Sequence, residues 1–191
     1  MSIEVCLGDQ AGHQYAELEL HARPAVLICV GQHDADIIGK DHRALQAEVD
    51  YVVQLGRGVV EIGPGTYTMG DSLQLRSRVT VRGAGGQIIL KKECEYHNML
   101  SADGHYGEAA VTLEDPIGFG LSRGIYVASR TQRNFHGVCA TILNGKEAYF
   151  TLTRPMNADI MVSDGGFAAT IYPVISGYEI QDARVEHLRV Y

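Results

Sequence analysis

Two pairs of acidic residues are the first candidates for a chemical role in this chain. Asp34 and Asp36 lie in a polar segment, and Asp182 and Glu186 lie close together near the end of the sequence. Carboxylates can bind a cation or a substrate, provided that several of them converge on one point. The spacing does not enforce convergence, because Asp182 and Glu186 fall on either side of an expected bend. The alternative, which we favour, is that both pairs are solvated surface charges.

Arg154 and the tyrosines could recognise a sugar. Arg154 follows a short apolar segment and could meet an anionic sugar, although a surface ion pair with Asp159 is the favoured alternative. Such pairs contribute little, typically under ~1 kcal/mol. Several tyrosines fall on expected strands, where core packing is the favoured alternative to stacking on a sugar ring. These are Tyr67, Tyr126, Tyr149, Tyr172 and Tyr178. The residues that we predict to bind substrate are Arg154, Tyr178, Asp182 and Glu186.

The histidines and cysteines predict neither a metal centre nor a nucleophile. His136 and Cys139 have the spacing of half a metal site, but no second pair accompanies them. The other cysteines are Cys6, Cys29 and Cys94, and no C-x-x-C pair occurs, so neither a disulfide framework nor a zinc site is predicted. The sequence also lacks a Gly-x-Ser-x-Gly elbow and a phosphate-binding loop. Catalytic residues are therefore left unassigned.

Charge and hydropathy limit the partners of the chain. A net charge of −7 argues against a nucleic-acid partner, because the phosphate backbone binds basic surfaces. The first residues lack the basic and apolar segments of a secretory signal. The longest apolar run, residues 25–30, is too short to span a bilayer, so no membrane partner is expected. The chain as written is therefore expected in the cytoplasm.

The elements that must position these residues begin with residues 56–91. Five apolar segments of three or four residues alternate there with Gly, Pro, Asp, Ser or Arg. Alternation of this kind, broken by turn residues, predicts short strands. The gaps are mostly too short for helical crossovers and few resemble hairpin turns, so the strands are predicted to stack as coils of a solenoid. Val60 and Val81, 21 residues apart, would then be separated by one coil.

The preceding residues predict strands and one helix. Residues 1–22 predict one or two peripheral strands, residues 25–30 a fully apolar strand, and residues 31–41 a polar loop. A helix is predicted over residues 42–55, because Asp41 is a suitable N-cap and the following glycine a suitable C′ residue. Its apolar stripe consists of Leu45, Val49, Val52 and Val53.

Residues 109–169 differ from the preceding residues in the length of their apolar segments and predict an inserted lobe. Strand candidates are longer there, and Asn144-Gly145 between two of them is a strong hairpin signal. A small antiparallel β lobe, packed on the side of the coils, is therefore predicted. The strand candidates are residues 110–113, 124–128, 138–143 and 148–152. From residue 170 short apolar segments return, including Tyr178 and Ile180, and predict further coils.

Several motifs carry a resemblance to a known family. Pro64-Gly65-Thr66-Tyr67 and Arg82-Gly83-Ala84-Gly85 match segments written Pro-Gly-x-Tyr and Arg-Gly-x-Gly, and Gly56-Arg57-Gly58 stands in the place of a Gly pair. With these motifs, residues 44–90 resemble the opening of right-handed parallel β-helix proteins of the pectate-lyase-like superfamily. Residues 176–191 resemble the start of the next coils, and residues 115–127 resemble a segment inserted in phage and bacterial β-helix proteins.

The resemblance implies an all-β fold: a right-handed parallel β-helix with an N-terminal capping helix and an inserted antiparallel lobe. A capping helix is needed because the end of a parallel coil stack exposes unpaired backbone. Residues 1–108 would form the N-terminal strands, the helix and the first coils, residues 109–169 the lobe, and residues 170–191 a truncated return to the coils.

The resemblance also implies a function connected with polysaccharide. The chain would be the N-terminal part of a protein that binds or processes polysaccharide, with the catalytic coils outside these residues. An enzyme of this family would be a polysaccharide lyase, a glycoside hydrolase or an epimerase; calcium would be its implied cofactor, and export its implied location. The alternative is a non-enzymatic structural, assembly or adhesion module that self-associates through its open C-terminal coil.

Overall fold

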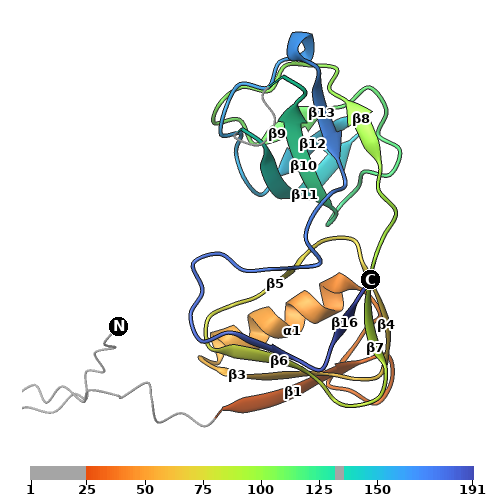
Figure 1. Cartoon of the computed structure of the whole chain (residues 1–191), viewed down its shortest axis with the longest axis vertical. Helices are drawn as coiled ribbons and strands as arrows, with labels where there is room; N and C mark the ends of the chain where they lie inside the picture. The colour runs from red at the N-terminus through yellow and green to blue at the C-terminus, as the bar shows by residue number, and fades with distance from the viewer. Residues whose placement is uncertain (1–24, 132–135) are drawn as a thin grey trace, which may run out of the picture.

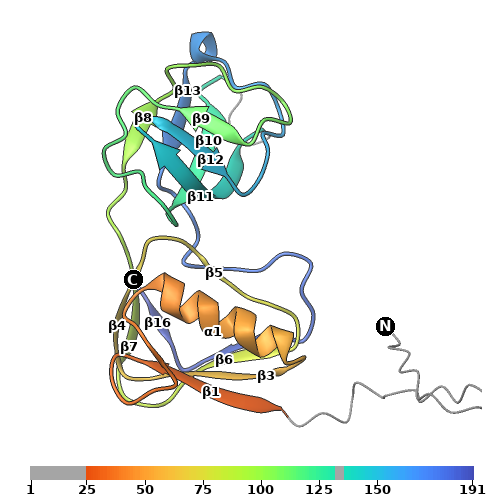
Figure 2. The ribbon, with the colours of Figure 1, turned by 180° about the vertical axis from the view of Figure 1, so that it is seen from behind.

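The structure is a computed structural model that describes residues 25–131 and 136–191. Within these residues the chain is all-β with a single α-helix. Figures 1 and 2 show two parts, one built from parallel strands around the helix and the other from antiparallel strands. The described part of the chain contains no helix with the length and apolarity of a membrane span. The strands predicted over residues 1–22 lie outside the described residues.

The largest parallel sheet has the strand order β15-β6-β3-β1-β2. Val60 pairs with Val81, which confirms the predicted 21-residue spacing, and Ile28 pairs with Val60 on the other side. β1 confirms the predicted apolar strand, whereas β2 lies in a segment that was expected to be a loop. The strands are β1 (Val26–Gly31), β2 (Ile37–Ile38), β3 (Gly58–Ile62), β6 (Val79–Gly83) and β15 (Arg184–Glu186).

Two smaller parallel sheets complete this part of the molecule. They have the orders β16-β7-β4 and β14-β5. Each of the consecutive strands β3, β4 and β5 therefore has a parallel neighbour from a later passage of the chain, namely β6, β7 and β14. The strands are β4 (Gly65–Met69), β5 (Leu73–Gln74), β7 (Ile88–Lys92), β14 (Ile175–Ser176) and β16 (Arg189–Val190).

Helix α1 (His42–Gln54) confirms the predicted helix. The Asp41 carboxylate accepts hydrogen bonds from the backbone N–H groups of Arg43 and Ala44, as expected of an N-cap. α1 lies between β5 and the sheet that contains β1, β3 and β6 (Figures 1 and 2). Its buried apolar residues, Leu45, Val49 and Val52, belong to the same hydrophobic core as the strands, so the helix closes the space between the parallel sheets.

The antiparallel part is a sheet of order β8-β13-β10-β11-β12-β9 with a separate hydrophobic core. The chain enters it through residues 93–96 and leaves it through residues 170–174. The 3-10 helix η2 (Val162–Asp164) precedes its last strand. The strands are β8 (His97–Met99), β9 (Ala110–Thr112), β10 (Gly124–Ser129), β11 (Val138–Lys146), β12 (Tyr149–Leu152) and β13 (Gly166–Ala169).

The structure corrects three local predictions. β8 lies before the predicted start of the lobe at residue 109 and pairs with β13, so the antiparallel sheet begins earlier than predicted. The hairpin of β11 and β12 forms, but Asn144 and Gly145 lie within β11, because a register shift between Ile142 and Asn144 moves the turn further along the chain. Tyr178 lies between β14 and β15 and not on a strand.

Candidate functional site

A cleft of about 680 Å³ lies where the parallel sheets meet the antiparallel part. One wall comes from β5 and the residues around it, and the other from β11 and residues 153–154. Residues 172–180, which return from the antiparallel part to the parallel strands, supply the remaining wall. Segments that are distant in the sequence therefore contribute to a single concave surface, where a ligand can contact both parts of the molecule.

Asp71 is the buried carboxyl group of this cleft, with 6% of its surface exposed. Its Oδ2 accepts a hydrogen bond from Thr141 Oγ1 (2.5 Å), and its Oδ1 accepts one from the Ser72 backbone N–H (2.7 Å). Burial raises the pKa of Asp71, and the hydrogen bonds from Thr141 and Ser72, together with nearby His42, oppose part of that increase. Asp71 thus links the coil segment after β4 to strand β11.

Arg154 and Tyr178 face each other in the same cleft. The guanidinium carbon of Arg154 lies 5.9 Å from the centroid of the Tyr178 ring, which is within the range of a cation–π interaction. Tyr178 is 73% exposed, so most of its ring surface remains accessible to a ligand. The pair therefore offers a positive charge beside an exposed aromatic surface.

Cys139 also lines the cleft, but its surroundings do not favour the nucleophilic thiolate. Burial raises the pKa of its thiol, and the positive charge of Arg154 opposes only part of that increase. The thiol therefore stays protonated at neutral pH, whereas the thiolate is the reactive form.

Tyr172 packs at the junction of the two parts. Its hydroxyl donates a hydrogen bond to the Met69 carbonyl oxygen (2.8 Å), and Lys92 Nζ lies 5.1 Å from its ring centroid. Burial raises the pKa of Tyr172 to about 12, so the hydroxyl remains protonated. Gly124 admits this packing, because a Cβ there would lie 2.5 Å from both Asp71 Oδ1 and the Tyr172 ring.

Polar contacts from His42 and Arg123 hold the two parts together beside the cleft. His42 Nδ1 accepts a hydrogen bond from the Gly70 N–H (3.1 Å), so Nε2 carries the proton and donates to the Ser122 carbonyl (2.8 Å). Arg123 forms a partly buried ion pair with Glu93 (2.7 Å). The cleft therefore has walls that are fixed by several independent bonds.

The structure brings together two of the four predicted substrate-binding residues. Arg154 and Tyr178 both line the cleft, whereas Asp182 and Glu186 are not among its lining residues. Asp182 is exposed in a backbone conformation with φ of 56°. Glu186 lies on β15, where it is paired in register with Arg82 of β6, and Arg82 also forms an ion pair with Glu61.

Asp159 has other partners than the predicted Arg154. One of its carboxylate oxygens accepts a hydrogen bond from the Tyr106 backbone N–H (2.9 Å) and lies 3.7 Å from His105 Nδ1. Arg154 is instead directed to Tyr178. The favoured surface pair of Arg154 with Asp159 was therefore wrong, and the arginine is placed in the cleft.

Asp71 and Thr141 were missed by the sequence analysis, whereas Tyr172 was named there with core packing as the favoured role, in agreement with its 6% exposure. Asp71 belongs to a Gly-Asp-Ser segment directly after a buried strand, and this position was the only local signal. Its partner Thr141 is 70 residues further along the chain, and Tyr172 is 103 residues from Met69. Short-range patterns carry no information on such pairs.

The described residues do not fit the calcium ion that the family resemblance implies. Calcium needs six to eight oxygen ligands, usually with several carboxylates. Among residues 25–131 and 136–191, no three His, Cys, Asp or Glu side chains are placed to hold a metal ion. No chemical step is therefore derived through a metal.

Fold and site define an all-β chain in which stacked parallel strands carry an antiparallel sheet, with a polar cleft at the junction. No family model matches the sequence, and no curated protein matches it. Three solved structures of phage tailspikes are similar to parts of the chain. The tailspike Gp54 of Acinetobacter baumannii bacteriophage AP22, solved in complex with A. baumannii capsular saccharide, has 7% identity and a TM-score of 0.37 over 71% of this chain and 26% of its own.

The two other tailspikes come from Pseudomonas phages. Tailspike gp61 of phage phi297 has 13% identity and a TM-score of 0.39 over 74% of this chain and 27% of its own. Tailspike gp49 of phage LKA1 has 14% identity and a TM-score of 0.33 over 70% of this chain and 26% of its own. The chain thus spans about a quarter of the length of these proteins. TM-scores below 0.5 do not establish a shared fold.

Proposed function

We propose that this chain forms the first coils of a right-handed parallel β-helix and binds an acidic polysaccharide in the cleft between the coils and the antiparallel sheet. The β-helix assignment is supported by the parallel registers. β3, β4 and β5 each have a parallel neighbour from a later passage, and the paired Val60 and Val81 are 21 positions apart in the sequence. Stacked passages of this kind are how a solenoid buries its core.

The observation that carries the binding proposal is the Arg154–Tyr178 pair. A sugar ring has apolar C–H faces, and an exposed tyrosine ring offers a flat apolar surface against which such a face can pack. The guanidinium of Arg154 beside that ring can pair with a sugar carboxylate through two hydrogen bonds. Extended chains can enter because the cleft opens between the two parts of the molecule.

The proposal is confined to binding. Glycoside hydrolysis uses two carboxyl groups on opposite sides of the scissile bond. Asp71, the buried carboxyl of the cleft, already accepts hydrogen bonds from Thr141 and Ser72 and joins the two walls. Glu179, next to Tyr178, also lines the cleft. Because Asp71 is engaged by both walls, we assign any lyase, hydrolase or epimerase activity to coils outside these residues.

Affinity electrophoresis through gels that contain polygalacturonate tests this function. The wild-type chain is expected to be retarded more than in gels with neutral dextran, and Arg154→Gln to bind about tenfold more weakly, because it loses the charged bidentate contact. Tyr178→Ala is expected to weaken binding to a similar degree. Arg184→Gln, an exposed arginine on β15, gives the same charge change away from the cleft. Equal retardation of Arg154→Gln and Arg184→Gln would exclude the cleft as the binding site.

A second function, self-association as a structural or adhesion module, is supported by the edges of the parallel sheets. β15 and β16 each end a sheet among the described strands. β15 carries the exposed Val185 and β16 the exposed Val190, and the exposed Tyr191 follows β16. An unprotected strand edge can pair with a strand of another copy.

A further inference from the structure

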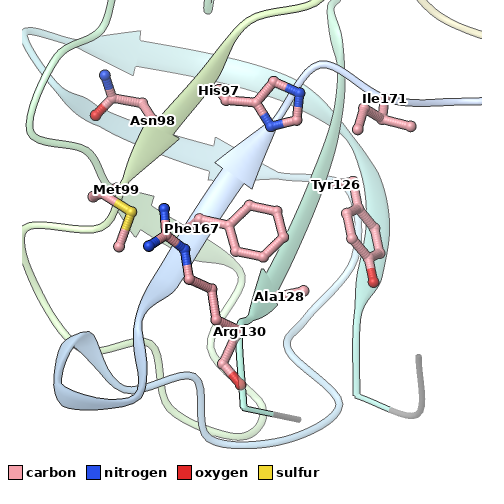
Figure 3. A pocket seen from close by; sticks show the side chains of 9 residues that line it. His97, Asn98, Met99, Tyr126, Ala128, Arg130, Phe167 and Ile171 are labelled. Carbon is pink, nitrogen blue, oxygen red and sulfur yellow. The ribbon is translucent and has the colours of Figure 1, made fainter. Parts of the chain in front are cut away.

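A second cavity, of about 470 Å³, lies on the antiparallel sheet and shares no lining residue with the cleft. It is formed over strands β8, β10 and β13 (Figure 3). Figure 3 shows the side chains of Tyr126, Phe167, His97 and Arg130 around this hollow. The binding proposal for the cleft does not account for it.

Strand register creates the hollow. Tyr126 of β10 pairs with Ala169 of β13, and Phe167 of β13 pairs with Ala128 of β10. Each large ring therefore stands opposite an alanine, and the small side chain of Ala128 lines the hollow beside the rings. Side chains in these paired positions share one face of the sheet, because directly opposed residues point to the same side.

The two rings form an aromatic corner. The centroids of Tyr126 and Phe167 are 6.2 Å apart, and the ring planes are inclined at 66°. Both residues are only partly buried, so a ligand can reach both ring surfaces. A flat nucleobase prefers a face parallel to a ring, whereas the C–H groups of a puckered sugar can contact two inclined surfaces at once.

A polar group also lies at the rim of this corner. His97 pairs with Ala169, so it shares the face of the two rings and can bond to a hydroxyl. Asn98 pairs with Ala168 and therefore lies on the other face of the sheet, where its Oδ1 accepts a hydrogen bond from the Asp115 backbone N–H (3.0 Å). The site therefore combines an apolar surface with a polar group at its rim, as ligand pockets do.

Arg130 supplies a positive charge at the rim. No carboxylate among the described residues lies within ion-pair distance of its guanidinium. Its aliphatic stem packs beside Gly165, where a Cβ would lie 3.2 Å from Arg130 Cδ, and the φ of 69° at Gly165 suits a glycine. The stem is therefore held in place, while the charged end remains available to an anion.

We propose that this cavity is a second saccharide site that binds one acidic sugar unit. The sugar carboxylate pairs with Arg130, the C–H face of the ring packs into the corner of Tyr126 and Phe167, and a hydroxyl bonds to His97. The site is independent of the cleft, since its residues and its ligand contacts are separate. Together the two sites would hold saccharide at two points of one chain.

Titration of the ¹⁵N-labelled chain with sodium glucuronate tests the proposal, with methyl glucoside as the uncharged sugar and adenosine monophosphate as the nucleotide. Glucuronate is expected to bind in the millimolar range and to shift amide signals of residues 97–99, 126–130 and 167. Arg130→Gln is expected to weaken this binding about tenfold, because a charged bidentate pair is lost. Phe167→Leu, which keeps an apolar side chain but removes the ring, is expected to weaken both sugars.

Matched controls separate this site from the cleft. Arg184→Gln makes the same charge change on a distant strand and is expected to leave glucuronate binding unchanged. The proposal would be overturned by equal affinity for the uncharged sugar, by unchanged binding in Arg130→Gln, or by tighter binding of the nucleotide. It would also be overturned by shifts confined to Asp71, Arg154 and Tyr178, which would assign the sugar to the cleft alone.

Discussion

At the scale of single residues, Glu48 is a carboxyl group on the buried face of helix α1. It is fully buried, and neither carboxyl oxygen has a hydrogen-bond partner among the described residues. Burial, together with the negative charge of Asp36, raises the pKa of Glu48 to about 8. A buried polar group without a partner costs free energy, and a charged one costs much more. The side chain is therefore protonated in the folded protein at neutral pH.

Glu48 makes stability depend on pH. Between its ordinary pKa of 4.5 and its folded-state pKa of about 8, the folded chain keeps a proton that the unfolded chain releases. The free energy of unfolding is therefore expected to fall as pH rises through this window, by at most about 1.4 kcal/mol per pH unit. Glu48→Gln cannot ionise and should remove this slope in urea unfolding curves measured by circular dichroism from pH 5 to pH 8.

Two further variants sharpen the Glu48 measurement. Glu48→Leu should also raise the free energy of unfolding at pH 8, by about 2–3 kcal/mol, because an apolar side chain replaces the buried acid. Glu114→Gln, at an exposed position of the antiparallel part, should keep the wild-type slope. A slope that persists in Glu48→Gln would show that another group titrates.

At the scale of elements, the hairpin of β11 and β12 turns at residues that the sequence did not single out. Lys146 pairs with Tyr149, so Glu147 and Ala148 form the turn, and Glu147 has a φ of 56°. That conformation costs free energy in a residue with a side chain, whereas glycine adopts it readily. Glu147→Gly is therefore expected to raise the free energy of unfolding by about 1 kcal/mol, measured by urea titration.

Gly145→Ala tests the same hairpin by a substitution that is expected to destabilise it. A Cβ at Gly145 would lie 2.6 Å from Phe150 Cδ1, so this substitution should lower the free energy of unfolding. The Asn144-Gly145 motif instead suggested a turn at Gly145. In that case Glu147→Gly would not raise the free energy of unfolding. Gly145→Ala would then strain the turn without affecting Phe150.

Local elements could be predicted because their signals are local. The strands of residues 56–91 follow from alternation and turn residues, and α1 follows from Asp41 and an apolar stripe. The hairpin turn was misplaced because the register shift between Ile142 and Asn144 depends on packing against neighbouring strands. Strand β8 was missed because two of its three residues, His97 and Asn98, are polar and its pairing with β13 is set by the whole sheet.

At the scale of the whole molecule, the cleft could be predicted only in part. Arg154 and Tyr178 were proposed as residue types that can bind a sugar, but their contact arises only when residues 172–180 return to the parallel strands. Asp182 and Glu186 were grouped by proximity in the sequence, whereas β15 directs Glu186 into register with Arg82. The hydrogen bonds of Thr141 with Asp71 and of Tyr172 with Met69, which join the two parts, span 70 and 103 residues, beyond the reach of any local pattern in the sequence.

The two proposed functions make opposite predictions for the edge of the parallel sheets. If the chain self-associates through β15 and β16, its sedimentation coefficient should rise with protein concentration. Val190→Lys should then abolish the rise, because a charge on an edge strand opposes pairing with another copy. Leu27→Lys is the control, because it places the same charge on β1, away from that edge. The exposed fractions are similar, 55% for Leu27 and 50% for Val190. This variant should associate as the wild type does. A single sedimentation coefficient at all concentrations, together with retardation by polygalacturonate, would contradict the assembly function and favour saccharide binding.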